Sequence, residues 1–216
     1  MHLFDNLAGE TVLENDCVVV ERHLLQPGQH TGLQTRSHPQ LLVYIRGGVL
    51  TAEEGRATLW KEGRVQWFDE DESAGPSRVN TGDAEIDFVS ISLKPVPPGS
   101  AVPEWKVEPI CYPNVVGEDL LDNGWVIVQR FLFEPGQWEG VHAHQPNMLF
   151  VHVRGGHWGA RSNLEPYAAY PQASPDGSVG WMEPVDIDVG HESCNIGSNP
   201  IDLVWISLKL GGARRR

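Results

Sequence analysis

Short runs rich in β-branched and aromatic residues recur along the chain, and clusters of glycine, proline, asparagine and aspartate separate them. Convincing helical periodicity is scarce. Runs of this kind with turn residues between them are typical of the strands of a sandwich or a closed barrel. We therefore predict an all-β protein with strands at residues 17–20, 40–45, 85–93, 125–133, 148–153 and 201–208.

The chain also contains an internal duplication. Residues 22–48 match residues 130–156 without a gap, at an offset of 108 residues. Further on, residues 89–94 match residues 204–209 at an offset of 115, and only Ser90 and Trp205 differ. A repeat of this length points to two units of similar fold, each large enough to have a core of its own.

Matched glycines mark equivalent positions in the two units. The pairs Pro27-Gly28 and Gly47-Gly48 of the first unit correspond to Pro135-Gly136 and Gly155-Gly156 of the second. Because proline and glycine favour turn conformations, we expect equivalent turns at these pairs. The second unit also carries extra residues around 163–171, for which a pocket wall or lid and a plain surface loop are the two readings.

A proline-rich segment lies between the two units. Residues 96–113 include Pro97, Pro98, Pro103, Pro109 and Pro113, a composition that suits an extended connection rather than a helix. The expected organisation is an N-terminal unit at residues 1–95, a linker at 96–113 and a C-terminal unit at 114–216.

Composition restricts the partners and the location of the protein. Sixteen basic and 29 acidic residues give a formal net charge of −13, which argues against binding to nucleic acid or anionic membranes. No apolar run approaches the ~20 residues of a membrane-spanning helix, and no secretion signal is visible at the N-terminus. Three widely spaced cysteines fit reduced thiols. We expect a cytoplasmic protein, either a monomer or a homodimer.

Three histidines of the second unit have no counterpart in the first. His142, His144 and His191 stand where the first unit has Gln34, Arg36 and Pro76. Residues two apart on a strand project to the same face, so His142 and His144 can present their imidazoles to one ion. His191 is the natural third ligand if the barrel brings the two segments together. Three neutral imidazoles suit Zn, Fe, Cu or Ni and leave coordination positions open.

These histidines stand in a motif context that resembles the cupin superfamily, and in particular a two-domain bicupin. The first cupin motif is met by Gly136, His142, His144 and Gly155, with Met148 in the place of its glutamate. The second motif is met by Gly190, His191 and Asn195. The resemblance implies two tandem double-stranded β-helix barrels, jelly-roll-like in form. It places one mononuclear metal in the second barrel. Because the first unit carries Gln34, Arg36, Gln40 and Pro76 at the ligand positions, we expect no high-affinity metal there.

The missing glutamate restricts the kind of metal site that the resemblance implies. Some cupin-like dioxygenases, including thiol dioxygenases and a β-diketone-cleaving enzyme, bind Fe(II) through three histidines alone, and the set here looks similar. We therefore favour one divalent metal ion, Fe(II) first, with Zn, Mn, Ni or Cu as alternatives. Met148 is expected to pack beside the metal. The remaining oxygen donors in this stretch are Gln145, Asn147, Glu139, Glu183 and Glu192, whose distances the sequence does not give.

A pocket next to the metal is expected from strand alternation. Met148, Phe150, His152 and Arg154 should share the inward face of one strand, with Tyr167 on an aromatic rim with His157, Trp158 and Trp181. We assign substrate binding to Met148, Phe150, Arg154 and Tyr167. His152 is the candidate catalytic acid or base, and the alternative is a core histidine bonded to the backbone. Because Arg154 has a counterpart in Arg46, a structural role is open for it as well.

The sequence thus favours a metal-dependent bicupin enzyme, most simply a non-heme Fe(II) dioxygenase acting on a small organic molecule. Two alternatives remain: a redox-neutral Zn, Mn or Ni isomerase, cyclase or lyase, and a small-molecule-binding cupin without activity. Fold alone does not select among them. The first unit is expected to act as a scaffold, and a metal-free pocket for an anionic effector at Gln34, Arg36 and Tyr44 is the alternative.

Overall fold

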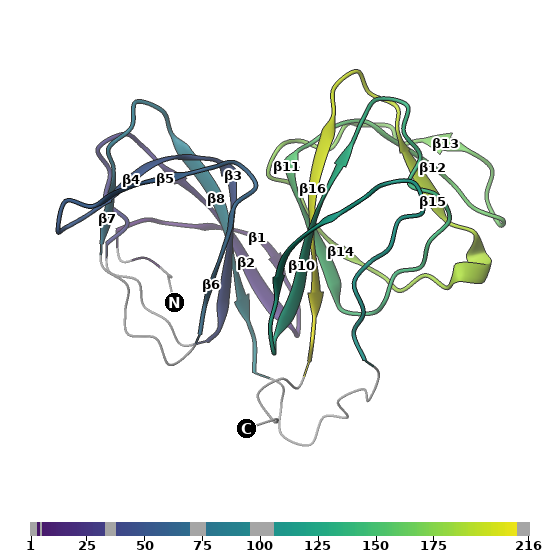
Figure 1. The fold of residues 1–216 in the computed structure, drawn as a ribbon, viewed down its shortest axis with the longest axis horizontal. Helices are drawn as coiled ribbons and strands as arrows, with labels where there is room; N and C mark the ends of the chain where they lie inside the picture. Colours follow the sequence, from purple (N-terminus) through teal and green to yellow (C-terminus); the bar gives the residue numbers. More distant parts are fainter. Residues whose placement is uncertain (1–3, 5, 33–37, 70–76, 96–105, 211–216) are drawn as a thin grey trace. The chain divides into compact units, whose positions relative to one another are not determined.

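The computed structural model describes residue 4 and residues 6–32, 38–69, 77–95 and 106–210. The chain forms two compact units, Met1–Pro95 and Val96–Arg216 (Figure 1). Both are built from antiparallel strands, and the one helix within the described ranges is a 3-10 turn, η1, at Ile187–Val189. The prediction of an all-β fold is confirmed. No helix in the described ranges is long and apolar enough to cross a membrane.

The described residues of the first unit form eight strands in two sheets. One sheet has the order β1-β2-β8-β3-β6 and the other the order β5-β4-β7. The strands are β1 (Glu10–Glu14), β2 (Val18–Leu25), β3 (Gln40–Arg46), β4 (Gly48–Ala52), β5 (Ala57–Trp60), β6 (Val65–Phe68), β7 (Arg78–Asn80) and β8 (Ile86–Leu93).

The second unit repeats this arrangement. Its sheets have the orders β14-β11-β16-β10-β9 and β13-β12-β15, the same orders as in the first unit when each strand number is raised by eight. The duplication read from the sequence is therefore a duplication of the fold. The strands are β9 (Glu118–Asp122), β10 (Val126–Phe133), β11 (Met148–Arg154), β12 (Trp158–Arg161), β13 (Ala168–Ala169), β14 (Val179–Met182), β15 (Glu192–Asn195) and β16 (Ile201–Leu208).

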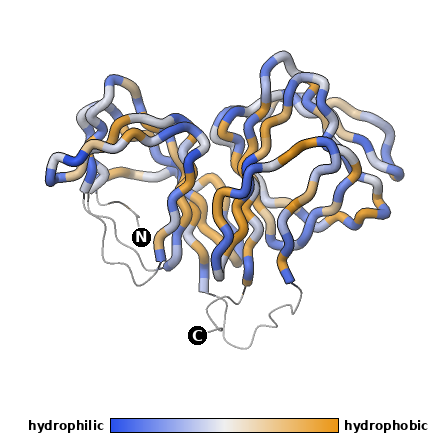
Figure 2. Tube along the Cα trace, in the orientation of Figure 1, coloured by the Kyte–Doolittle hydropathy of each residue, from blue (hydrophilic) through white to orange (hydrophobic). Residues whose placement is uncertain are grey.

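The six predicted strands correspond to β2, β3, β8, β10, β11 and β16, the strands richest in apolar residues. In Figure 2 the hydrophobic stretches follow the long strands, whereas the loops between them are mostly hydrophilic. Every residue of β16 is buried, because this strand lies between β10 and β11 in its sheet. The core of the second unit contains residues from both sheets, such as Phe133 on β10 and Trp158 on β12. The apolar faces of the two sheets therefore meet inside the unit.

The matched Pro-Gly pairs form equivalent turns, as expected. The amide of Gln29 donates to the carbonyl of Gln26 at 2.9 Å, and the amide of Gln137 donates to the carbonyl of Glu134 at 3.0 Å. Gly28 and Gly136 have φ values of 77° and 79°, a left-handed conformation that glycine adopts without strain.

The matched Gly-Gly pairs do not form turns. They lie where β3 passes to β4 and where β11 leads to β12, and no backbone hydrogen bond of the described residues closes a turn there. A Cβ atom on Gly47 would overlap the carbonyl oxygen of Trp60, and one on Gly155 would overlap that of Ser174. The expectation of turns at these pairs is therefore corrected. At Gly47 and Gly155 two backbones approach too closely for any side chain, whereas Gly48 and Gly156 pack against the side chains of Ile86 and Ile201.

Part of the expected connection packs into the second unit. Ile110 and Tyr112 are each 5 % exposed and belong to the core of that unit, and the amide of Ile110 donates to Oε1 of Gln129 at 2.8 Å. Residues 96–105 lie outside the described residues. The extra segment of the second unit contributes β13, which pairs with β12.

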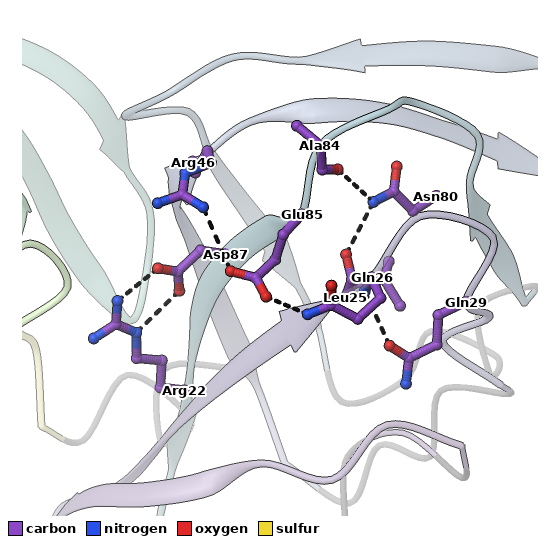
Figure 3. Close-up of polar contacts among 9 residues, drawn as sticks. All are labelled: Arg22, Leu25, Gln26, Gln29, Arg46, Asn80, Ala84, Glu85 and Asp87. Carbon is purple, nitrogen blue, oxygen red and sulfur yellow. Dashed lines mark hydrogen bonds and ion pairs between the residues drawn. The ribbon is translucent and has the colours of Figure 1, made fainter.

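A paired arginine and aspartate hold the same two strands together in each unit. In the first, Arg22 on β2 donates to both carboxylate oxygens of Asp87 on β8, at 3.0 and 2.6 Å (Figure 3). In the second, Arg130 on β10 donates to Asp202 on β16 at 2.9 and 2.5 Å. Both aspartates are buried, so two-pronged pairing supplies the hydrogen bonds that their carboxylates lose on leaving water.

Candidate metal centre

His142, His144 and His191 come together in the second unit. One ligand nitrogen from each lies within 4.8 Å of the others, and the three residues could hold a metal ion. His142 and His144 do not lie in a regular strand but in the extended segment before β11, where His144 exchanges two backbone hydrogen bonds with Val185. The segment keeps the alternation of a strand, because both histidines are buried while Val141 and Ala143 are exposed.

The third histidine is brought in by the helix η1 and the turn after it. Gly190, with a φ of 64°, ends η1 in the left-handed conformation, and His191 follows immediately before β15. The amide of His142 donates to the carbonyl of His191 at 3.2 Å. The segments before β11 and before β15 are thus joined through their backbones at the position of the ligands.

The ring of His142 has a defined orientation and tautomer. Its Nδ1 lies 2.9 Å from the carbonyl oxygen of Gly140, so Nδ1 carries the hydrogen and Nε2 presents a lone pair. That Nε2 lies 2.9 Å from Nε2 of His144. A backbone carbonyl that fixes one ring nitrogen while the other faces a common point is the usual support of a metal-binding histidine.

Burial keeps the cluster uncharged. It lowers the pKa of His142 to about 4 and that of His144 to about 3, and it lowers the pKa of His191 as well. All three imidazoles are therefore neutral near pH 7, the form in which histidine binds a metal. Their number, their neutral state and their common focus fit one divalent first-row metal ion.

A buried carboxylate belongs to the same site. Glu139 is 4 % exposed, and its Oε2 lies 3.9 Å from Nε2 of His142. The amide of Ser193 donates to the same Oε2 at 2.9 Å. Burial raises the pKa of Glu139 to about 7, although its hydrogen bonds with Ser193 oppose the rise. Of the other two carboxylates of this stretch, Glu183 is exposed, and Glu192, next to His191, pairs with Arg161.

Tyr112 links this carboxylate to the core. Nε1 of Trp205 donates to the Tyr112 hydroxyl at 2.7 Å, and the nearby Glu139 carboxylate contributes to raising the pKa of that tyrosine, after burial. The Tyr112 ring stands edge-on against the ring of His142, with centroids 4.6 Å apart. The indole and the phenol thus form a hydrogen-bonded pair that lies beside Glu139 and a candidate ligand.

A cavity of about 180 Å³ lies next to the histidines. His144, His191 and Glu139 are on its wall, and no lysine or arginine is among its lining residues. The remainder of the wall is mostly apolar. It consists of Phe150, His152, Trp158, Tyr170, Ser174, Met182, Val185, Ser193, Leu203 and Trp205.

The expected pocket residues divide into two groups. Phe150 and His152 line the cavity, whereas Met148 is fully buried in the core and is not among the lining residues. Arg154 is exposed, because a β-bulge between His152 and Arg154 ends the alternation of β11. The expectation of one shared inward face is thus wrong beyond His152. The same bulge separates Tyr44 from Arg46 in the first unit.

The aromatic rim differs from the expected one. Tyr167 is 51 % exposed and packs against Trp138, with ring centroids 6.2 Å apart, rather than lining the cavity. Tyr170, from the same extra segment, lines it instead, which gives that segment a place in the pocket wall. Trp205 is a lining residue that sequence reasoning did not assign. A signal for it existed, because Trp205 is the one residue that differs from its twin in an otherwise identical run.

His152 has both ring nitrogens engaged by the protein. Nε1 of Trp158 donates to its Nε2 at 3.0 Å, so the hydrogen lies on Nδ1, which is 2.9 Å from the hydroxyl of Ser178. Burial lowers its pKa to about 4. These contacts hold a neutral imidazole in the wall of the cavity. A catalytic role for His152 stays a prediction.

The first unit offers no comparable cluster. Within its described residues no group of three metal-ligating side chains comes together. Gln34, Arg36 and Pro76, which correspond to the three histidines, lie outside the described residues. Tyr44 is buried and stacked on Trp60, with ring centroids 4.8 Å apart. The expected effector pocket stays a prediction.

The chain matches no protein-family model and no curated protein sequence. Among solved structures, the cupin 2 conserved barrel domain protein from Leptotrichia buccalis is 8 % identical, with a TM-score of 0.53 over 97 % of this chain and 92 % of that one. A variant of oxalate decarboxylase from Bacillus subtilis is 15 % identical, with a TM-score of 0.53 over 94 % and 72 %. A mutant of salicylate 1,2-dioxygenase from Pseudoaminobacter salicylatoxidans is 9 % identical, with a TM-score of 0.54 over 89 % and 70 %.

These similarities establish the fold. The chain has a cupin fold, in the form of two tandem β-barrel units, as the sequence resemblance implied. Because a decarboxylase and a dioxygenase are similar to it to nearly the same degree, the fold does not select the reaction.

Proposed function

We propose that this protein is a metal-dependent enzyme of the non-heme Fe(II) dioxygenase type that acts on a small organic substrate. The observation that carries the proposal is that the three-histidine group opens onto a small, mostly apolar cavity. A buried group of ligands beside an apolar pocket is suited to hold the polar end of a substrate at the ion and its body away from water.

The chain's own residues account for binding and orientation. His142, His144 and His191 would hold the ion, with the His142 ring fixed by the carbonyl of Gly140. Three protein nitrogens leave coordination positions for a substrate. When bound, Fe(II) would supply the activation of dioxygen. No protein nucleophile is required in this scheme.

The cavity also indicates a class of substrate. Its volume of about 180 Å³ suits a molecule smaller than the drug-sized ligands that pockets of roughly 300–1,000 Å³ enclose. A substrate with two separated carboxylates would find no lysine or arginine among the lining residues for the second one. We therefore favour a molecule with one chelating end, through oxygen or sulfur, and an apolar body that packs against Phe150 and Trp205.

A redox-neutral reaction at the same site is the second candidate. Three neutral imidazoles with open positions are also the donor set of catalytic zinc sites, in which the metal acts as a Lewis acid. An isomerase, cyclase or lyase would use the same cavity and the same ligands. Oxygen consumption separates the two candidates, because only the first uses dioxygen.

Metal analysis of the purified chain without a histidine tag tests the proposal. We expect about one equivalent of iron per chain, lost in the double variant His142→Ala, His144→Ala and retained in His157→Ala. His157 is the matched control, because it is a histidine of the same unit that does not line the cavity. Its Nε2 lies within hydrogen-bond distance of the carbonyl oxygen of Tyr170. Oxygen uptake would then be screened with small aromatic hydroxy acids, β-diketones and thiols.

The alternative results discriminate clearly. Zinc, manganese or nickel that is lost in the same variant, with no oxygen uptake, would support the redox-neutral candidate. Metal content that is unchanged in the double variant would contradict both enzymatic candidates and favour a small-molecule-binding scaffold.

A further inference from the structure

The duplication provides an internal control for Glu139. At the offset of 108 residues its counterpart in the first unit is Thr31. Both side chains accept the same backbone hydrogen bond: the amide of Ser193 donates to Glu139 Oε2 at 2.9 Å, and the amide of Arg78 donates to Thr31 Oγ1 at 3.0 Å. The fold therefore needs only a neutral oxygen at this position. A buried carboxylate is the more costly choice, and it occurs in the unit that has the histidines.

The residues around Glu139 also differ from their counterparts in the first unit. Tyr112, which lies near the carboxylate, corresponds to Phe4, and Trp205, which donates to the Tyr112 hydroxyl, corresponds to Ser90. All three residues, Glu139 included, differ from their twins. The group thus belongs to what distinguishes the second unit, not to the shared fold.

The carboxylate faces the histidines. Glu139 Oε2 lies 3.9 Å from the Nε2 of His142, a nitrogen that has no hydrogen because Nδ1 donates to Gly140. Two ligands that are each about 2.1 Å from one metal lie at most about 4.2 Å apart, so the spacing between Glu139 and His142 is within the range of a shared ion. The carboxylate does not lie within 4.8 Å of all three histidine nitrogens, so binding requires the Glu139 side chain to turn toward the ion. An ionised carboxylate has about four lone-pair sites, of which the amide of Ser193 uses one. Facing electron pairs of this kind are stabilised by a cation between them.

We propose that Glu139 is a fourth, oxygen ligand of the metal held by His142, His144 and His191. It would take over the function of the glutamate that Met148 replaces in the cupin motif, from a different place in the chain. Met148 is fully buried in the core and offers no competing donor. The assignment rests on the proposed metal centre. A carboxylate beside three imidazoles gives the donor set a negative charge and an oxygen ligand, which Fe(II) and Mn(II) accept readily.

Titration of the metal-free protein with Co²⁺ tests the assignment without any turnover. Visible absorption of Co²⁺ reports its set of ligands, and the titration gives the dissociation constant. For Glu139→Gln we expect binding weakened about 100-fold or more, beyond the roughly 10–100-fold that changes outside the coordination sphere cost, together with an altered spectrum. Glu183→Gln is the matched control, because it removes the charge of an exposed carboxylate in the same unit. It should leave affinity and spectrum unchanged.

Folding is controlled by a second variant. Glu139→Thr copies Thr31 and keeps an acceptor for the amide of Ser193, so its thermal unfolding should occur at or above the wild-type temperature. Its affinity for Co²⁺ should fall as in Glu139→Gln.

Each remaining result decides one point. If the wild type binds Co²⁺ and Glu139→Gln binds equally well, or more weakly with an unchanged spectrum, Glu139 is not a ligand and the metal centre stands without it. If the wild type itself binds no Co²⁺ that depends on His142 and His144, the proposed metal centre fails, and the assignment of Glu139 fails with it.

Discussion

Asn195 belongs to the second cupin motif, yet its contacts serve the fold. Its Nδ2 donates to the carbonyls of Phe133 and Asn199 at 2.9 Å each, and its Oδ1 accepts from the amide of Gly197. Asn80 makes the same three hydrogen bonds in the first unit: its Nδ2 donates to the carbonyls of Leu25 and Ala84 (Figure 3), and its Oδ1 accepts from the amide of Gly82. A motif residue with an identical role in the unit without histidines is structural. Glu139, whose twin is a threonine, shows the opposite case.

His152 should make stability depend on pH. Its pKa is about 4 in the folded protein, against 6.5 when unperturbed, because burial disfavours the charged ring. Above pH 6.5 the ring is neutral in both states and its contribution is complete. As pH falls toward 4, only the unfolded state takes up the proton, so stability is lost by up to about 3 kcal/mol.

Urea unfolding of the metal-free protein between pH 8 and pH 4.5 measures this effect. His152→Gln should lower stability at pH 8, because it removes the hydrogen bonds with Trp158 and Ser178. The difference from the wild type should be constant above pH 7 and should shrink below pH 6.5. A difference that stays constant down to pH 4.5 would contradict a neutral, buried His152.

At the scale of strands, Gly155 is expected to be intolerant of substitution. It lies between β11 and β12, where an added Cβ would overlap the carbonyl of Ser174. Gly155→Ala should therefore destabilise the protein by about 1–3 kcal/mol, because two backbone segments must move apart. Gly124→Ala is the control, since an added Cβ there meets nothing within 4 Å. Equal midpoints of urea unfolding for the two variants would show that the β11–β12 junction is not close-packed.

The strands that the sequence predicted are the ones with a strong local signal. The runs that became β8 and β16 have five and six apolar residues of eight, and nearly every residue is buried because each strand lies between two neighbours. Strands such as β7 and β13 have three and two residues, too few to show an alternating pattern. They form because each pairs with a longer strand of its three-stranded sheet, β7 with β4 and β13 with β12, and this pairing is not visible in a short stretch of sequence.

The site was predictable to the extent that it repeats a local pattern. His142 and His144 are two residues apart and His191 lies in a motif, so their meeting followed from the fold. The role of Glu139 did not, because its partners lie at residues 112 and 193, far away in sequence. Arg154 was wrongly predicted to face inward, because a β-bulge interrupts the alternation of β11 before it. No sequence pattern indicates this bulge.

At the scale of the whole molecule, the two units have one fold and different chemistry. Their sheets have the same strand order, and the buried pairs Arg22–Asp87 and Arg130–Asp202 are equivalent. Only the second unit gathers three histidines within the part of the chain that the structure describes. A metal ion bound to these histidines should stabilise the second unit directly. The first unit, which has the same fold, then serves as an internal control.

Metal binding should therefore protect the two units unequally. A ligand at 100 times its dissociation constant stabilises the folded state by about 2.7 kcal/mol, which slows exchange through unfolding by about 100-fold. Hydrogen exchange measured by mass spectrometry, with and without Co²⁺, should slow in β10 and β16 and stay unchanged in β2 and β8. These pairs of strands are equivalent in fold, so differences of topology do not enter the comparison. If hydrogen exchange slows equally in both units, the units do not unfold separately. The first unit would then open only when the second unit, which binds the ion, opens as well.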